Sequence, residues 1–142
     1  MTGGPVITFA MQEPCVDALK AIRSELRRNS LHVAVEVDVA NRIRRELGAG
    51  VAPCRILYID DPVLLLEGVV FNRGAALGIP QPIVVCSDGN GTQVLVRSSE
   101  SLGGGVPAST HEPLRELHGR ILRTIGAIGQ REGETCHVLP SN

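Results

Sequence analysis

The sequence contains few aromatic side chains: no tryptophan, one tyrosine and two phenylalanines. Proteins that bind single-stranded nucleic acid usually stack bases on aromatic rings, and nucleic-acid binders usually carry net positive charge. The formal net charge of this chain is -1, so we expect no nucleic-acid partner. Lysine is also scarce, because Lys20 is the only lysine among 14 basic residues. The paired arginines lie next to glutamates on predicted helices, so we interpret them as solvated helix faces.

The chain also lacks an apolar run of roughly 18 residues, the length that a membrane span needs. Its first residues lack the basic region and apolar stretch of a secretory signal. We therefore expect no membrane partner and a cytoplasmic location. The four cysteines (Cys15, Cys54, Cys86 and Cys136) are far apart in the sequence and form no C-x-x-C motif. In a cytoplasmic protein such cysteines are expected to be reduced, mostly buried and without redox function.

The length of 142 residues suits a single domain, residues 1–142. Within it we distinguish a core, 6–97, and a flexible glycine-rich loop, 98–110, which could act as a lid. A C-terminal helix, 113–132, and a tail, 133–142, complete the chain.

Runs of β-favouring residues predict strands at 6–11, 32–37, 55–59, 83–86 and 92–96, and helical spacing predicts helices at 14–29, 39–47, 62–72 and 113–132. The element order βαβαβαββα predicts an α/β (α+β) fold with a single mixed β-sheet of about five strands, packed with about four helices.

Several junctions carry specific signals. Asp38 and Asp61 are placed to cap the helices that follow them, Gly48 to end a helix, and Pro62 to occupy a first helical position. The segment 87–91, with its Asp-Gly and Asn-Gly pairs, predicts a tight hairpin between antiparallel strands.

The Asp60-Asp61-Pro62 corner follows a predicted strand and opens a helix, where open α/β sheets often place ligands. Its two carboxylates could hold a cation, an amine or a hydroxyl, or share a proton. The alternative is that Asp61 only caps the helix and Asp60 is solvated. Tyr58 has the same strand parity as Asp60 and could line the same pocket, or it could pack in the core.

A second polar group lies on the strand at 32–37. Its alternation places His32 and Glu36 on one face, with Asp38 two residues further, and a histidine there could transfer protons near neutral pH. If that face is exposed, the group has no functional meaning. The histidines have no metal-ligand spacing and no cofactor motif is present, so we expect neither a metal ion nor a cofactor.

Three short stretches, in their order and spacing, carry a resemblance to a known family. They are Ala18-Leu19-Lys20, Glu36-Val37-Asp38 leading into Leu47-Gly48, and Arg55-Ile56-Leu57 before Pro62. They resemble the family called Domain of Unknown Function 302, over roughly Val6 to Val96, with the remainder interpreted as an extension. The resemblance implies a small homodimeric α/β protein of bacterial type, for which no general activity is established.

Many members of that family carry a Cys-Asn-Pro motif after the third strand and a Pro-Cys-Asn motif before the fourth. The matching residues here are Asp60-Asp61-Pro62 and Pro80-Gln81-Pro82, so both cysteines are replaced. The resemblance therefore implies a pocket in which a carboxylate and an amide stand where relatives have thiols, with a changed ligand or changed chemistry.

The leading hypothesis is a small-molecule-binding homodimeric domain with a ligand near Asp60, Asp61, Tyr58 and Gln81. Dimerisation would use apolar surface left by the sheet and by the apolar stripe of the last helix, from Leu114 to Ile128, unless that helix folds onto its own sheet.

Two other classes of function stay open. One is a cofactor-independent acid–base enzyme (isomerase, lyase or cyclase), with Asp60 or Glu36 as base and Tyr58 or His32 as proton donor. The other is a protein-interaction module whose last helix binds a partner.

Overall fold

The structure is a computed structural model, and it describes residues 6–102 and 108–132. The strands of the described residues form one sheet in the order β2-β3-β4-β5-β1-β6. They are β1 (Val6–Met11), β2 (His32–Asp38), β3 (Cys54–Asp60), β4 (Gln81–Asp88), β5 (Gly91–Arg97) and β6 (Gln130–Arg131).

Four α-helices and three short 3₁₀ helices connect these strands within the described residues. They are α1 (Cys15–Arg28), α2 (Val39–Leu47), α3 (Pro62–Phe71), η1 (Arg73–Leu77), η2 (Ser99–Ser101), η3 (Ala108–Thr110) and α4 (His111–Gly126). The expected fold class, one sheet packed with helices, is confirmed.

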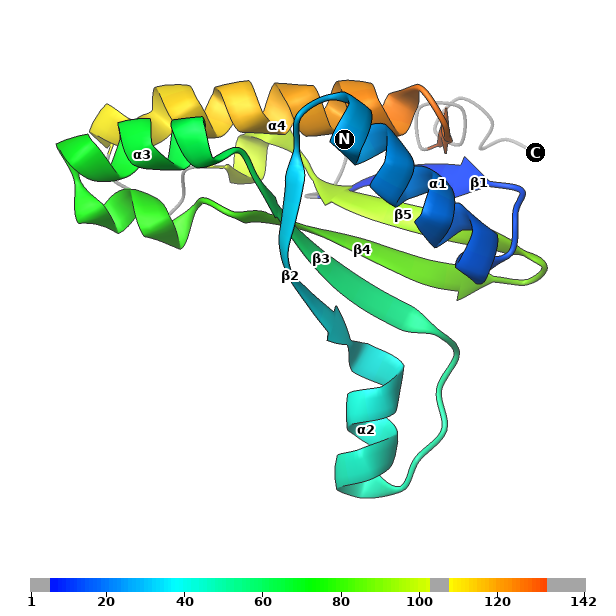
Figure 1. The fold of residues 1–142 in the computed structure, drawn as a ribbon. Helices are drawn as coiled ribbons and strands as arrows, with labels where there is room; N and C mark the ends of the chain where they lie inside the picture. The colour runs from blue at the N-terminus through cyan, green and yellow to red at the C-terminus, as the bar shows by residue number, and fades with distance from the viewer. Residues whose placement is uncertain (1–5, 103–107, 133–142) are drawn as a thin grey trace.

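The sheet is antiparallel at every pairing in the described residues, whereas a mixed sheet was expected. A parallel neighbour requires a crossover that carries the chain back over the sheet. Here α2 protrudes beyond the sheet, so β3 returns directly beside β2 (Figure 1). The connection through α3 and η1 likewise brings β4 back antiparallel to β3.

Helices α1, α3 and α4 lie on one side of the sheet, and the other side carries no helix of the described residues (Figure 1). The core forms between them because alternate strand side chains face the helices. Leu57, Ile59, Ile83 and Val85 are fully buried on that face. On the opposite face, strand residues such as Tyr58 are only half-buried.

Helix α4 packs its apolar stripe against its own sheet. Leu114, Leu117, Ile121 and Ile125 are each at most 2% exposed. Leu122 and Ile128 are half-buried against the same core. The stripe therefore packs on its own sheet, which is the alternative that the sequence analysis left open. His118 is also packed, with its Nε2 atom 2.7 Å from the carbonyl oxygen of Arg97.

The last helix differs in length from the predicted 113–132. It begins at His111, because Pro113 fits a first helical turn, and it ends at Gly126. Residues 130 and 131 form β6, which pairs with β1. The segment 103–107 of the expected lid loop and the expected tail, 133–142, lie outside the described residues.

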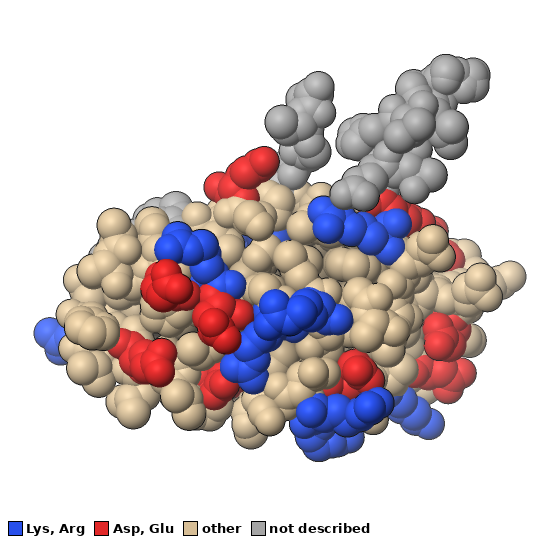
Figure 2. All heavy atoms as spheres, turned by 90° about the horizontal axis from the view of Figure 1, so that it is seen from above, with Lys and Arg blue, Asp and Glu red and all other residues tan. Residues whose placement is uncertain are grey.

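The predicted caps are confirmed. The Asp38 carboxylate accepts a hydrogen bond from the Asn41 backbone N–H (2.9 Å), and Gly48 ends α2 with a φ of 71°. The hairpin between β4 and β5 turns at Gly89, whose φ is 61°. No helix of the described residues is long and apolar enough to cross a membrane. Figure 2 shows basic and acidic side chains interspersed on the helix-covered side.

Candidate functional site

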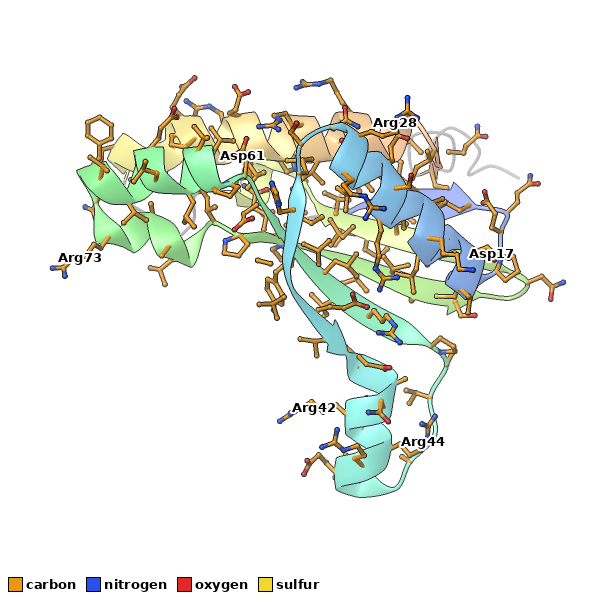
Figure 3. The ribbon with its side chains drawn as sticks, viewed as in Figure 1. Asp17, Arg28, Arg42, Arg44, Asp61 and Arg73 are labelled. Atoms are coloured by element: carbon orange, nitrogen blue, oxygen red, sulfur yellow. The ribbon has the colours of Figure 1, made fainter. Side chains whose placement is uncertain are left out.

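The corner at the end of β3 holds Asp61 through two contacts. One carboxylate oxygen accepts a hydrogen bond from the Val63 backbone N–H (2.9 Å), so Asp61 caps α3. The other is 2.5 Å from Nη1 of Arg120 on α4. This hydrogen bond from Arg120 holds the pKa of Asp61 below its ordinary value, against a smaller opposing effect of burial. Asp61 therefore joins α3 to α4 at this corner (Figure 3).

Arg120 also ties the corner to the turn after α1. Its Nη2 atom donates to the carbonyl oxygen of Asn29 at 2.9 Å and lies 3.4 Å from that of Ser30. One guanidinium on α4 therefore connects that helix with the start of α3 and with the turn after α1. No feature of the local sequence around Arg120 indicates this role, because its partners are about 60 and 90 residues away in the chain.

Asp60 differs from Asp61 because its carboxylate neither caps a helix nor pairs with an arginine among the described residues. It is only 8% exposed, and its side chain has no hydrogen bond or ion pair with the described part of the chain. Burial raises the pKa of Asp60; nearby His32 lowers it, and the Asp61 charge raises it. A buried carboxylate with a raised pKa is a candidate proton acceptor or donor.

His32 and Tyr58 lie on the same sheet face as Asp60. His32 is paired with Asp60 in the register between β2 and β3, and directly opposite residues share a face. Tyr58 lies two residues before Asp60 on β3, so the expected shared parity is confirmed. His32 is exposed and Tyr58 is half-buried. This helix-free face therefore brings together three of the predicted site residues.

The grouping of Glu36 with His32 was wrong. The register shifts between Val33 and Val35, which leaves Ala34 as an extra residue in β2. Such a bulge reverses the alternation of side chains beyond it. Glu36 is consequently paired with Leu57 on the helix-covered face, while His32 lies on the opposite face.

Glu36 is bound by two arginines. Nη2 of Arg23 on α1 lies 2.7 and 2.6 Å from its carboxylate oxygens, and Nη1 of Arg55 lies 2.8 Å from one of them. Burial would raise the pKa of Glu36, but the hydrogen bonds from Arg23 and Arg55 outweigh it and hold the pKa below its ordinary value. Glu36 is thus an ionised partner of arginines, which makes it a poor general base.

Gln81 is also committed to the structure. It is 3% exposed, and its Nε2 atom donates a hydrogen bond to the carbonyl oxygen of Leu114 on α4 (2.9 Å). Gln81 is paired with Ile59 and shares its helix-covered face, whereas Tyr58 lies on the other. The structure does not bring the Gln81 and Tyr58 side chains together.

The structure contains a cleft that sequence reasoning missed. It has a volume of ≈ 350 Å³ and lies between the first turns of α1, helix α2 and the start of β3. We call it the α1–α2 cleft. Its polar lining residues include Asp38, Asn41, Arg44 and Arg55, and its apolar ones include Val16, Leu19 and Val51.

Arg44 and Arg55 contribute different charges to the α1–α2 cleft. Arg55 is held by Glu36 and by Asp38, whose Oδ2 atom is 3.2 Å from Nη2 of Arg55. Arg44 is exposed and makes no hydrogen bond or ion pair with residues 6–102 or 108–132. Figure 3 shows Arg42 and Arg44 on opposite sides of α2. Of the two, only Arg44 lines the cleft.

No group of three or more His, Cys, Asp or Glu side chains within the described ranges could hold a metal ion.

The described elements define a small α+β domain with an antiparallel sheet covered on one face by helices. The chain belongs to the family described as Domain of unknown function DUF302, which it matches over residues 7–127. The match includes α4, whereas the sequence analysis limited the resemblance to roughly Val6 to Val96 and interpreted the last helix as an extension.

The fold is similar to that in the crystal structure of an uncharacterized conserved DUF302 protein from Bacillus stearothermophilus. The TM-score is 0.78 at 13% sequence identity, and the match covers 88% of this chain and 98% of that one. At this identity the likeness shows the fold alone. No curated protein matches the chain.

Proposed function

We propose that this chain is a homodimeric domain that binds a small molecule, and that an acidic organic ligand occupies the α1–α2 cleft. The observation that carries the proposal is a concave site of ≈ 350 Å³ in which Arg44, an arginine without a partner among the described residues, meets apolar walls. Ligand sites typically combine a largely apolar lining with a few convergent polar groups.

The charges of the cleft favour an anion. Its charged lining residues are Arg44, Arg55 and Asp38. Arg55 balances the charge of Asp38, whose other oxygen accepts the helix-capping hydrogen bond, and this leaves Arg44 available. Val16, Leu19 and Val51 offer contacts to an apolar ligand body. A small carboxylic acid satisfies both features, because an arginine binds a carboxylate through two parallel hydrogen bonds.

Calorimetric titration with hexanoate and benzoate, each compared with its uncharged amide, tests this proposal. We expect the acids to bind and the amides to bind more weakly. Arg44→Gln should weaken binding about 10- to 100-fold, corresponding to about 1.5–3 kcal/mol for a charge-assisted hydrogen bond. Arg42→Gln, on the opposite side of α2, is the matched control and should bind as the wild type does. Equal affinity of the Arg44 and Arg42 variants would remove the basis of the proposal.

A second candidate function is acid–base catalysis on the helix-free face, and the buried carboxylate of Asp60 favours it. Because Glu36 is bound by arginines, Asp60 is the base in this proposal. His32 and Tyr58, which lie on the same sheet face, are the proton donors. The same three residues would contact a ligand bound there.

Hydrogen exchange provides a test that requires no known substrate. The protein is incubated with small 2-oxo acids in heavy water, and deuterium uptake beside the carbonyl group is followed by NMR. Asp60→Asn should abolish any uptake that the wild type catalyses, whereas Asp88→Asn, in the exposed hairpin turn, should not. Uptake that persists in Asp60→Asn would exclude Asp60 as the base.

The homodimer is proposed to form through α3 and η1. Because most of the α4 stripe is buried, we look to the exposed apolar side chains of the described residues, half of which lie on α3 and η1, and we call these the α3 patch. It consists of Val63, Leu66, Val70, Phe71 and Leu77, which are 61–77% exposed. Exposed apolar groups of this kind often mark protein interfaces.

Light scattering on the purified chain should give about twice the chain mass. Leu66→Asp should convert the dimer to a monomer, because it places a charge in the interface. Leu47→Asp on α2 changes a leucine that is even more exposed but lies outside the α3 patch, and this variant should stay dimeric. A monomeric wild type, or a dimeric Leu66→Asp variant, would contradict this assignment.

A further inference from the structure

Two cysteines that are 32 positions apart in the sequence lie directly opposite each other in the sheet. Cys54 begins β3 and Cys86 lies near the end of β4, and the two residues are register partners. Both are free thiols and half-buried. Directly opposite residues project their side chains to the same face of a sheet. This pair cannot be inferred from sequence spacing, because the register of β3 and β4 brings the two residues together.

The hydrogen-bonding pattern identifies the kind of pair that these cysteines form. One position further along the same register, the Ser87 backbone N–H donates to the carbonyl oxygen of Pro53 at 3.0 Å. Hydrogen-bonded and non-hydrogen-bonded pairs alternate in an antiparallel ladder. Cys54 and Cys86 therefore form a non-hydrogen-bonded pair, the type with the closer side chains.

This geometry suits a covalent bond. The Cα atoms of a non-hydrogen-bonded pair are about 4.5 Å apart. Disulfides span Cα separations of about 4.4–6.8 Å. Rotation of the two side chains can therefore bring the sulfur atoms into bonding distance without displacing either strand.

We propose that Cys54 and Cys86 are a redox pair that closes to an intramolecular disulfide with a low-molecular-weight organic disulfide as the oxidant. The thiolate of one cysteine attacks a sulfur of the organic disulfide and releases one thiol. The thiolate of the second cysteine then attacks the resulting mixed disulfide and releases the other thiol. Overall the two protein thiols lose two hydrogens and two electrons, and the organic disulfide becomes two thiols. Cys54 also lines the α1–α2 cleft, but the redox proposal rests on the register of β3 and β4 and does not depend on the ligand proposed there.

The bond would join the two ends of a segment that contains the corner. Residues 55–85 hold most of β3, all of α3 and η1, and the first part of β4. The disulfide would therefore keep β3 and β4 paired at the end of the sheet distant from Asp60. Because the disulfide restricts the conformational freedom of the unfolded chain, the oxidised protein should be more stable than the reduced protein.

The thiols should react slowly at neutral pH. Burial raises the pKa of Cys54, and the nearby Cys15 and Asp38 raise it further. Burial also raises the pKa of Cys86, together with Cys54, Cys15 and Asp88. Because the thiolate is the attacking species, disulfide formation should accelerate between about pH 7 and pH 9.

The experiment uses the full chain, incubated with a fixed ratio of oxidised to reduced glutathione, acid-quenched and alkylated. Mass spectrometry of the intact protein should show the loss of two hydrogens, and peptide mapping should link Cys54 to Cys86. The oxidised protein should melt at a higher temperature than the reduced protein. Cys86→Ala should lose the internal bond and accumulate a mixed disulfide of Cys54 with glutathione.

A variant that carries both Cys15→Ala and Cys136→Ala is the matched control, because it removes the other two thiols. It should form the same bond as the wild type. Circular dichroism tests whether each variant is folded. If Cys86→Ala is unfolded, peptide mapping of the control variant decides whether Cys54 and Cys86 form the bond. A control variant that stays reduced or carries two mixed disulfides would overturn the proposal, as would a wild-type bond that involves Cys15.

Discussion

Replacement of Asp61 tests whether the corner is stabilised by its cap alone or also by Arg120. Asp61→Ala removes both the hydrogen bond to Val63 and the contact with Arg120. A lost N-cap costs about 1 kcal/mol. A lost charge-assisted hydrogen bond costs about 1.5–3 kcal/mol, and less where solvent screens it. Because the side chains of Asp61 and Arg120 are only 17% and 19% exposed, screening is modest.

The expected loss for Asp61→Ala is therefore about 2–4 kcal/mol, more than a cap alone would give. Asp61→Asn keeps an oxygen that can cap the helix but loses the charge, so it should cost about 1–2 kcal/mol. The Arg120 hydrogen bond lowers the folded-state pKa of Asp61 below the unfolded value of about 3.9. The charge-dependent stabilisation is thus complete above about pH 5 and is lost as the pH falls through the folded-state pKa.

Urea unfolding at equal protein concentration, at neutral and at acidic pH, measures these differences. The difference between wild type and Asp61→Asn should narrow in acid. In a double-mutant cycle with Arg120→Gln, we expect a coupling energy of about 1–2 kcal/mol. The exposed pair of Glu112 and Arg115 on the same helix is the control, and Glu112→Gln should cost less than about 0.5 kcal/mol. A coupling energy near zero would refute the structural role given to Arg120.

Three further substitutions test other parts of the structure by the same unfolding assay. Asp60→Asn should leave stability unchanged or raise it by up to about 1 kcal/mol at pH 7, because burial disfavours the charged form of Asp60 in the folded state and so raises its pKa. The gain should disappear when the pH falls below the pKa that Asp60 has in the unfolded chain. Glu36→Gln should cost about 1–3 kcal/mol at pH 7, and the loss should shrink in acid because the pKa of Glu36 is lowered. Gly91→Ala should cost about 1–3 kcal/mol, since a Cβ there would lie 2.6 Å from the carbonyl oxygen of Met11, whereas Gly50→Ala meets nothing within 4 Å and should be nearly neutral.

Local signals predicted the elements and their junctions well. Asp38 and Asp61 cap their helices because a carboxylate at that position can accept a backbone N–H from the first turn. Gly48 ends α2 because a left-handed φ carries no steric cost at glycine. These outcomes depend on residues within one helical turn of each other, and therefore they can be inferred from a single sequence.

Long-range features were not predictable in the same way. The direction of each strand depends on where the helices pack, and α2 protrudes beyond the sheet instead of crossing it (Figure 1). The bulge at Ala34 leaves no compositional trace, yet it decides which face Glu36 occupies. The contact between Asp61 and Arg120 joins residues 59 positions apart, and only the tertiary structure reveals it.

The register also changes how the family resemblance applies to function. The positions that match the cysteines of many relatives are Asp60 and Gln81, and in this chain they have opposite roles. Asp60 shares the helix-free face with His32 and Tyr58, whereas Gln81 faces the helices and is bound to the backbone of α4. A ligand on the helix-free face would therefore contact Asp60 without reaching the Gln81 side chain. It follows that substitution of Gln81 should affect the packing of α4, and that only substitution of Asp60 reports on chemistry at this end of the sheet.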